Sequence, residues 1–196
     1  MNRQEVVTKN HLFLLGEGMM REKIIKTERI YSGRILNLEI LDVELPDGTI
    51  QKREVIDHHG AAAVVAIDGE GRVLLVKQFR SASRETMIEI PAGLLDPNET
   101  PIACAARELQ EETGYKPGKI EALGGHYVAP GYTREFIHLF LATELSESKL
   151  PADADEHIEV ERATLDEALG MIERGEIVDG KTIIGLLKYA ARVKRG

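Results

Sequence analysis

The chain has 196 residues, of which 43% are hydrophobic and 30% charged, and this composition is typical of globular proteins and excludes disorder as the main state. The formal net charge of −8, from 25 Lys and Arg against 33 Asp and Glu, makes nucleic acid an unfavourable partner. The single cysteine excludes an intramolecular disulfide, and no apolar run approaches the roughly 20 residues that span a bilayer, so we expect a cytoplasmic protein without a membrane partner.

The N-terminal part of the chain is predicted to form a β region. Residues 1–22 show no sustained periodicity and are expected to be a flexible lead-in. Alternating apolar residues at 36–45 and 50–56 flank a Pro-Asp-Gly turn sequence, which is typical of a hairpin. We therefore expect an N-terminal antiparallel β region over residues 23–58.

Residues 59–196 are predicted to form a second domain of α+β class. An apolar run at 61–67, a Gly-rich turn and a second run at 73–79 indicate a buried hairpin. Because the strands come in groups with few helices between them, a regularly alternating parallel sheet is disfavoured. The other expected elements are strands at 87–90, 120–128 and 135–143 and helices at 101–113, 164–175 and 181–193.

Capping residues bound the helix predicted at 101–113. Thr100 supplies an N-cap hydroxyl, Pro101 suits the first helical position, and Gly114 suits a left-handed C-terminal cap.

One side of this helix carries apolar residues. Ile102, Ala105, Ala106 and Leu109 are expected to lie on a sheet, which leaves the acidic side of the helix facing a cleft. Cys104 lies beside these small apolar residues and is expected to pack there, not to act as a nucleophile.

Three glutamates crowd along the acidic side. Glu111 and Glu112 stand three and four residues after Glu108, so the carboxylates gather within one turn, where each like-charged pair costs roughly a few tenths of a kcal/mol. A hard divalent cation would reverse that cost by taking carboxylate oxygens as ligands, so the cluster favours a site for Mg²⁺ or Mn²⁺. A solvated acidic stripe on a surface helix is the alternative interpretation of these residues alone.

Residues 93–115 carry a longer pattern. It consists of Gly93, five residues, Glu99, seven residues, and then the run Arg-Glu-Leu-Gln-Glu-Glu-Thr-Gly-Tyr at 107–115. This resembles the signature of the Nudix hydrolases at every specified position. The resemblance implies a Nudix-type α/β/α sandwich around a mixed β-sheet. It also implies an enzyme in which water cleaves the diphosphate of a nucleoside diphosphate linked to another group.

The resemblance also assigns roles to individual residues. Glu111 and Glu112 would be catalytic, while Glu99 and Arg107 would hold the loop and the helix in place. Bound cations would neutralise developing charge and orient the attacking water, and they would let an acidic protein hold an acidic substrate. The metal ligands that it implies are the Ala92 carbonyl, Glu108, Glu112 and, as a further ligand, Glu111.

A proline downstream resembles the mark of the ADP-ribose pyrophosphatase subfamily. Pro130 is the sixteenth residue after Gly114, and in that subfamily the loop here containing Pro130 and Gly131 lines the adenosine side of the substrate. The residue matching Arg80 contacts phosphate, and the one matching Glu89 lies beside the metals or the ribose. From the residues alone, Pro130 and Gly131 fit an ordinary turn between two strands equally well.

The general base is expected on a loop before Ile158. Subfamily members place an acidic residue there, and this chain offers Asp153, Asp155 and Glu156. We select Glu156 because it directly precedes the next strand in the family manner, with the two aspartates as alternatives.

Together with the acidic cluster, the resemblance implies Mg²⁺- or Mn²⁺-dependent hydrolysis of ADP-ribose to AMP and ribose 5-phosphate. The resemblance further implies a homodimer in which the N-terminal hairpin exchanges between subunits. Three alternatives stay open: a Nudix hydrolase for another nucleotide sugar or a dinucleotide polyphosphate, a non-catalytic nucleotide-binding module, and an accidental match in an acidic helix. The loop at Pro130 argues against an oxidised nucleoside triphosphate as substrate.

Overall fold

The computed structural model describes residues 21–148, 150 and 158–195. The chain divides into two compact units, which are considered separately. The first contains the described residues up to His58 together with Ala129–Glu135, and the second contains His59–Val128 and the described residues from Phe136 onward.

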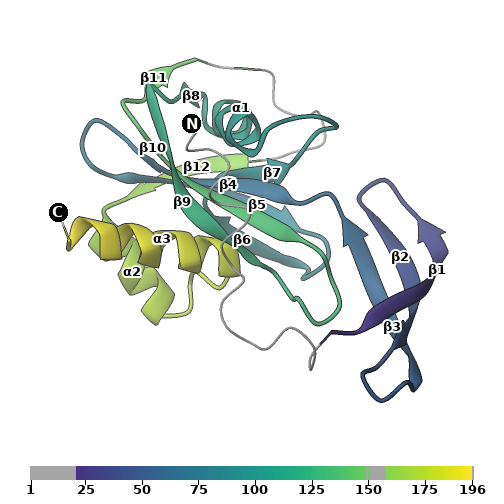
Figure 1. Ribbon diagram of the computed structural model, residues 1–196. Coiled ribbons are helices and arrows are strands. Elements are labelled where there is room, and N and C mark those ends of the chain that lie inside the picture. The colour runs from purple at the N-terminus through teal and green to yellow at the C-terminus, as the bar shows by residue number, and fades with distance from the viewer. Residues whose placement is uncertain (1–20, 149, 151–157, 196) are drawn as a thin grey trace, which may run out of the picture. The chain divides into compact units, whose positions relative to one another are not determined.

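The first unit is built on a three-stranded antiparallel sheet with β2 in its centre (Figure 1). Its strands are β1 (Lys23–Ser32), β2 (Leu36–Glu44) and β3 (Ile50–His58). The predicted hairpin corresponds to β2 and β3, whose tip is closed by a hydrogen bond from Leu45 N to Thr49 O at 2.8 Å. Gly48 adopts a φ of 81° in that turn, which is the left-handed conformation that glycine tolerates best.

The segment Ala129–Glu135 pairs with β3 inside this first unit. Ile56 N donates to Tyr132 O at 2.7 Å, and Arg134 N donates to Ile56 O at 3.0 Å. The Arg134 guanidinium also reaches Asp57 at 2.9 Å and the buried carboxylate of Glu39 at 3.0 Å. The loop with the predicted Pro130 is therefore tied to the N-terminal sheet by both backbone and charge.

The second unit contains a seven-stranded mixed sheet. The order along it is β12-β5-β4-β10-β9, with β6 paired to β5 and β7 paired to β4. Only the β4–β10 pair is parallel among these strand pairs of the described chain. The strands are β4 (Ala61–Ile67), β5 (Val73–Arg80), β6 (Glu85–Glu89), β7 (Ala92–Leu94), β9 (Lys119–Tyr127), β10 (Phe136–Thr143) and β12 (Ile158–Ala163). A small separate pair is formed by β8 (Tyr115–Lys116) and β11 (Ser146–Glu147).

Helices cover both faces of this sheet. Successive residues of β4 alternate between two cores: Ala62 and Val64 pack with α1 (Pro101–Thr113), while Ala63 and Val65 pack with residues of α2 (Leu165–Glu173) and α3 (Gly180–Val193). Figure 1 shows α1 on one side of the sheet and α2 and α3 on the other. All residues of β4 are buried, so helices must pack on both faces of the sheet around this strand. The result is the predicted α/β/α sandwich.

The ends of α1 agree with the predicted caps. The Thr100 side chain accepts from Ala103 N, Pro101 begins the helix, and Gly114 takes the left-handed conformation with a φ of 77°. Similarly, Thr164 and Glu167 form a capping box at the start of α2. Among the described residues, no helix is long and apolar enough to cross a membrane.

The predicted buried side of α1 is partly wrong. Ala105 and Leu109 are fully buried as expected, but Ile102 is 40% exposed, whereas Glu112 is only 8% exposed. The helix is turned so that part of its acidic side, and not Ile102, packs inward. Cys104 is fully buried, and burial raises the pKa of its thiol to about 12, which confirms a packing role.

Candidate functional site

The short strand β7 brings two predicted metal ligands against the backbone. Glu112 Oε2 accepts a hydrogen bond from Ala92 N at 3.1 Å. The Glu108 carboxylate packs on Gly93 so closely that any Cβ at position 93 would overlap it. A side chain at position 93 would therefore displace the Glu108 carboxylate from this place. Three of the predicted ligand residues, Ala92, Glu108 and Glu112, thus meet along β7 and α1.

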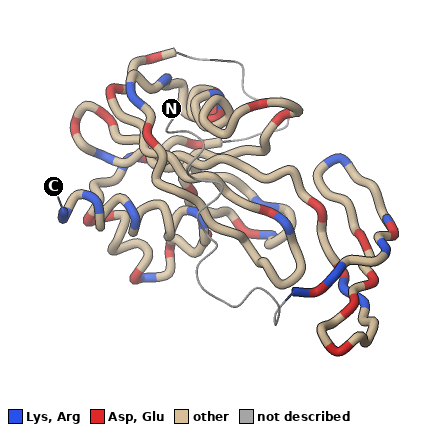
Figure 2. The backbone as a smooth tube through the Cα atoms, in the orientation of Figure 1, with Lys and Arg blue, Asp and Glu red and all other residues tan. Residues whose placement is uncertain are grey.

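Arg107 holds the remaining acidic side chains. Its guanidinium donates two hydrogen bonds to Glu99, both at 2.9 Å, one to Glu108 at 2.7 Å and one to Glu111 at 2.9 Å. These carboxylates raise the pKa of Arg107, and Arg107 lowers the pKa of Glu99. A further donation to Leu94 O at 3.2 Å ties α1 to β7. The predicted roles of Arg107 and Glu99 in holding loop and helix agree with these contacts, and Figure 2 shows acidic positions on α1 and in the loop before it.

The donors along α1 and β7 are of the kind that binds a divalent cation. Glu108 and Glu112 have side chains with little exposure, and both carboxylate and carbonyl oxygens suit Mg²⁺ and Mn²⁺. In the described part of the chain, however, no three Asp, Glu, His or Cys side chains already stand as a metal-binding group. Glu108 and Glu111 contact Arg107 instead. These carboxylates are chemically suitable ligands for a cation, but a cation would have to compete with Arg107 for them.

Arg80 and Glu89 form a second part of the site. Arg80 donates from Nε and Nη2 to the two carboxylate oxygens of Glu89, each at 2.7 Å, which is the bidentate geometry of a strong ion pair. Burial tends to raise the pKa of Glu89, but contacts with Arg80 and Lys181 outweigh it and lower that pKa overall. The hydrogen bond to Glu89 raises the pKa of Arg80, and the negative charge of Glu112 raises it further. The two parts of the site therefore interact electrostatically.

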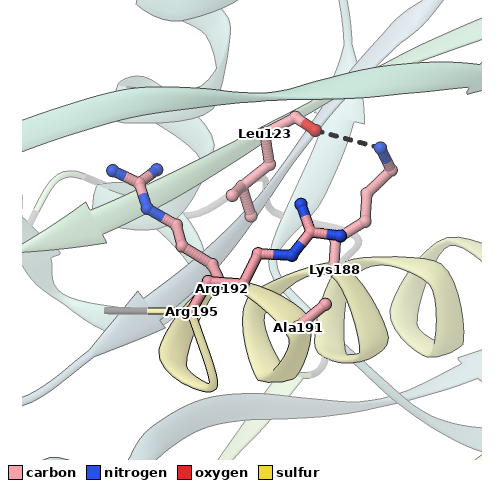
Figure 3. Close-up of a pocket in the computed structure, with 5 residues that line it drawn as sticks. All are labelled: Leu123, Lys188, Ala191, Arg192 and Arg195. Carbon is pink, nitrogen blue, oxygen red and sulfur yellow. Dashed lines mark hydrogen bonds between the residues drawn. The ribbon is translucent and has the colours of Figure 1, made fainter.

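A groove of about 370 Å³ lies elsewhere in the second unit (Figure 3). Lys188 of α3 donates to Leu123 O of β9 at 3.2 Å across it, and Arg192 pairs with Glu121. No residue predicted for the site lines this groove, so it is separate from the acidic cluster. The groove is lined by Leu123, Lys188, Ala191, Arg192 and Arg195.

The family model described as the NUDIX domain matches residues 57–184. The chain belongs to the Nudix family. Among its relatives is a protein named ADP-ribose pyrophosphatase from Bacillus subtilis, 46% identical over 83% of this chain and 89% of that protein. A protein named methanol dehydrogenase activator from Bacillus methanolicus is 44% identical over 86% of this chain and 92% of its own length.

A third relative carries a different substrate in its name. A GDP-mannose pyrophosphatase from Citrobacter koseri is 41% identical over 70% of this chain and 76% of its own length. A solved structure entitled ADP compounds hydrolase has a TM-score of 0.80, with 21% identity, and covers 90% of this chain and 96% of that one. This last likeness concerns the fold. It agrees with the predicted Nudix-type architecture.

Five predicted site residues of this Nudix protein lie outside the described part of the second unit. Pro130 and Gly131 belong to the first compact unit, whereas the acidic helix belongs to the second. The three candidate bases, Asp153, Asp155 and Glu156, lie outside the described residues.

The sequence interpretation missed a basic residue of the site. Lys181, in the first turn of α3, contacts Glu89 and Asp179. The signal was present locally, because Asp179 stands three residues before Thr182 and caps the helix through Thr182 N. The partner Glu89, however, lies 92 residues away in the sequence, and no local sequence pattern predicts such a contact.

Proposed function

We propose that this Nudix protein hydrolyses the diphosphate bond of ADP-ribose, or of a related nucleoside diphosphate sugar, to AMP and ribose 5-phosphate in the cytoplasm. The observation that carries this proposal is the convergence of the signature glutamates Glu108 and Glu112 on the Ala92–Gly93 backbone. The names of the relatives from Bacillus subtilis and Citrobacter koseri support a nucleotide-sugar substrate.

The proposed metal site uses the Ala92 carbonyl, Glu108 and Glu112, with Glu111 as a further ligand. Nudix hydrolases generally need divalent metal ions, and we propose Mg²⁺ or Mn²⁺ for this one. When bound, such ions would neutralise charge on the diphosphate and orient the attacking water. Glu111 and Glu112 are proposed to take part in catalysis at the same place.

The proposed substrate contacts are Arg80, Glu89 and the loop at Pro130 and Gly131. Arg80 has a side chain 38% exposed and offers a planar cation that suits phosphoryl oxygens. Glu89 is proposed to lie beside the metals or the ribose, and the Pro130 loop to line the adenosine side. Glu156 is proposed as the general base that accepts a proton from the attacking water.

A homodimer is proposed for the assembly, with the N-terminal sheet exchanged between subunits. Every residue of β1 is exposed, including Ile24, Ile25 and Ile30, each at least 45%. Apolar side chains gathered on one exposed strand are typical of a surface that a partner covers. A monomer in sedimentation measurements at micromolar concentration would contradict this part of the proposal.

The test of the function is a phosphate-release assay coupled to alkaline phosphatase, which acts on AMP and ribose 5-phosphate but not on an intact diphosphate diester. We expect phosphate from ADP-ribose only with Mg²⁺ or Mn²⁺ present. Glu112→Gln should lower the rate at least 100-fold. The matched control Glu173→Gln, an exposed carboxylate of α2, should keep it. Metal-independent turnover, or an active Glu112→Gln variant, would contradict the proposed site.

The same assay distinguishes the base among the loop acids. Glu156→Gln should lower kcat strongly with little change in KM, whereas Asp153→Asn and Asp155→Asn should not. The reverse pattern would transfer the role to an aspartate.

GDP-mannose is the second candidate substrate, since the Citrobacter koseri relative is named for it. Running the assay separately with ADP-ribose and with GDP-mannose over a range of concentrations gives kcat/KM for each and ranks the two. A higher value for GDP-mannose would overturn the preference for ADP-ribose while leaving the reaction class intact.

A further inference from the structure

A buried ion-pair cluster joins β6 to the start of α3. Glu89, the last residue of β6, is 1% exposed and accepts hydrogen bonds from Arg80 and from the ammonium group of Lys181. The Lys181 side chain is itself only 11% exposed, and its ammonium also contacts Asp179 at 3.1 Å. Buried charges are costly unless each is paired, so removing any member of this cluster disturbs the others.

The backbone at the start of α3 fixes the position of Lys181. Asp179 accepts hydrogen bonds from Thr182 N at 3.0 Å and from Thr182 Oγ1 at 2.6 Å. The same hydroxyl oxygen accepts from Ile90 N at 2.9 Å. Ile90 directly follows Glu89, so the turn that carries Lys181 is attached to the strand end that carries its partner.

Glu89 fixes the orientation of Arg80 in turn. The bidentate contact uses Nε and Nη2 of Arg80, whereas Nη1 makes no hydrogen bond to another residue within the described ranges. A guanidinium is planar and rigid, so holding one edge sets the direction in which the other edge points. The remaining donors of Arg80 therefore have a defined direction only while the Glu89 carboxylate is held still.

We propose that Lys181 is a positioning residue that holds the Glu89 carboxylate and, through it, aligns the Arg80 guanidinium for the substrate diphosphate. This inference rests on the proposed function, in which Arg80 contacts phosphate. Lys181 acts from the protein side of Glu89 and does not touch the substrate. Without its ammonium, the buried carboxylate keeps only Arg80 as a cationic partner among the described residues, and both side chains can rotate together.

The kinetic test compares Lys181→Met with Lys188→Met. Lys188 lies on the same helix and its ammonium donates to a backbone carbonyl, so the control removes a lysine of α3 without touching the cluster. We expect Lys181→Met to raise KM for ADP-ribose about tenfold, the effect of one lost charged hydrogen bond, with kcat changed less than about twofold. Lys181→Arg, which keeps the cation, should recover most of the loss, and Lys188→Met should match the wild type. An unchanged KM in Lys181→Met overturns the proposal.

A second measurement needs no turnover. The Nε–H signal of Arg80 in a ¹H–¹⁵N spectrum, assigned by its loss in Arg80→Lys, reports the bond to Glu89. We expect its hydrogen exchange to become at least about tenfold faster in Lys181→Met and to stay unchanged in Lys188→Met. Lys181→Gln, which keeps a donor but loses the charge, serves if Lys181→Met does not fold.

These outcomes separate the two proposals. Equal exchange in the wild type and Lys181→Met overturns the positioning role, whatever the activity. If the wild type turns over no ADP-ribose, the proposed function fails, and the exchange comparison alone decides whether Lys181 holds Arg80 through Glu89.

Discussion

Replacing Arg107 by methionine tests what holds the acidic helix together. The side chain is 27% exposed and contacts Glu99, Glu108 and Glu111, whose side chains are 14%, 12% and 26% exposed. Methionine keeps most of the aliphatic packing but leaves three carboxylates without their shared cation. Removing one partner of a buried ion pair costs about 3 to 5 kcal/mol, and because these side chains are only partly buried, we expect a loss at the lower end of that range. For a domain of this size, that corresponds to a melting temperature lower by on the order of 10 °C.

The assay is thermal unfolding in EDTA at pH 7, with Arg174→Met as the control. Arg174 also contacts a carboxylate, Glu176 at 2.6 Å, but both side chains are about half exposed, so this pair should contribute nothing measurable. Similar melting temperatures for Arg107→Met and the wild type, or equal losses in both variants, would refute the reasoning that burial makes the Arg107 contacts strong.

The difference in melting temperature between the wild type and Arg107→Met should also depend on pH. Arg107 lowers the pKa of Glu99 from its ordinary value of 4.5, so the stabilisation is present above pH 4.5 and is lost as the pH falls through the folded-state pKa. The gap in melting temperature between wild type and Arg107→Met should therefore narrow below pH 4.5. A gap that widens there would show that the sign of the linkage is wrong.

Two further predictions concern close packing around α1. Gly93→Ala should lower the rate of ADP-ribose hydrolysis at least 100-fold, because the added methyl group displaces the Glu108 carboxylate. The control Gly69→Ala, where a Cβ has no neighbour within 4 Å, should keep the wild-type rate. Equal rates in the two variants would place Glu108 outside the reaction. Burial raises the pKa of the Cys104 thiol to about 12, so at pH 8 this thiol should react with iodoacetamide only when the protein unfolds in urea. Rapid labelling of the native protein would contradict the packing.

Features set by neighbouring residues were predictable from the sequence. The bounds of α1 follow from Thr100, Pro101 and Gly114, which act on the backbone within one turn. The family could be recognised because the whole pattern from Gly93 to Tyr115 resembles its signature and lies on a single loop and helix. Both kinds of information are local, so one sequence sufficed.

Features that depend on distant contacts were not predictable in the same way. The three-residue strand β7 is too short to show periodicity, and it exists because Ala92–Leu94 pairs with β4. The inward turn of Glu112 follows from the Ala92 N–H that it accepts, 20 residues earlier in the chain. The apolar pattern alone placed Ile102 in the interior, because such a pattern considers only hydrophobic side chains. It takes no account of a backbone N–H, here that of Ala92, that pairs with a carboxylate.

Three acidic side chains of the candidate site pair with an arginine, and this bears on how an acidic protein holds an anionic substrate. Arg107 holds Glu108 and Glu111, and Arg80 holds Glu89, so the acids do not stand as a bare negative cluster. A divalent cation that takes Glu108 must replace a charged hydrogen bond from Arg107, which lowers its net affinity but leaves the guanidinium close by with a donor released. Because that donor would become available only with the cation bound, the site would gain a hydrogen-bond donor for the diphosphate in addition to the charge of the metal.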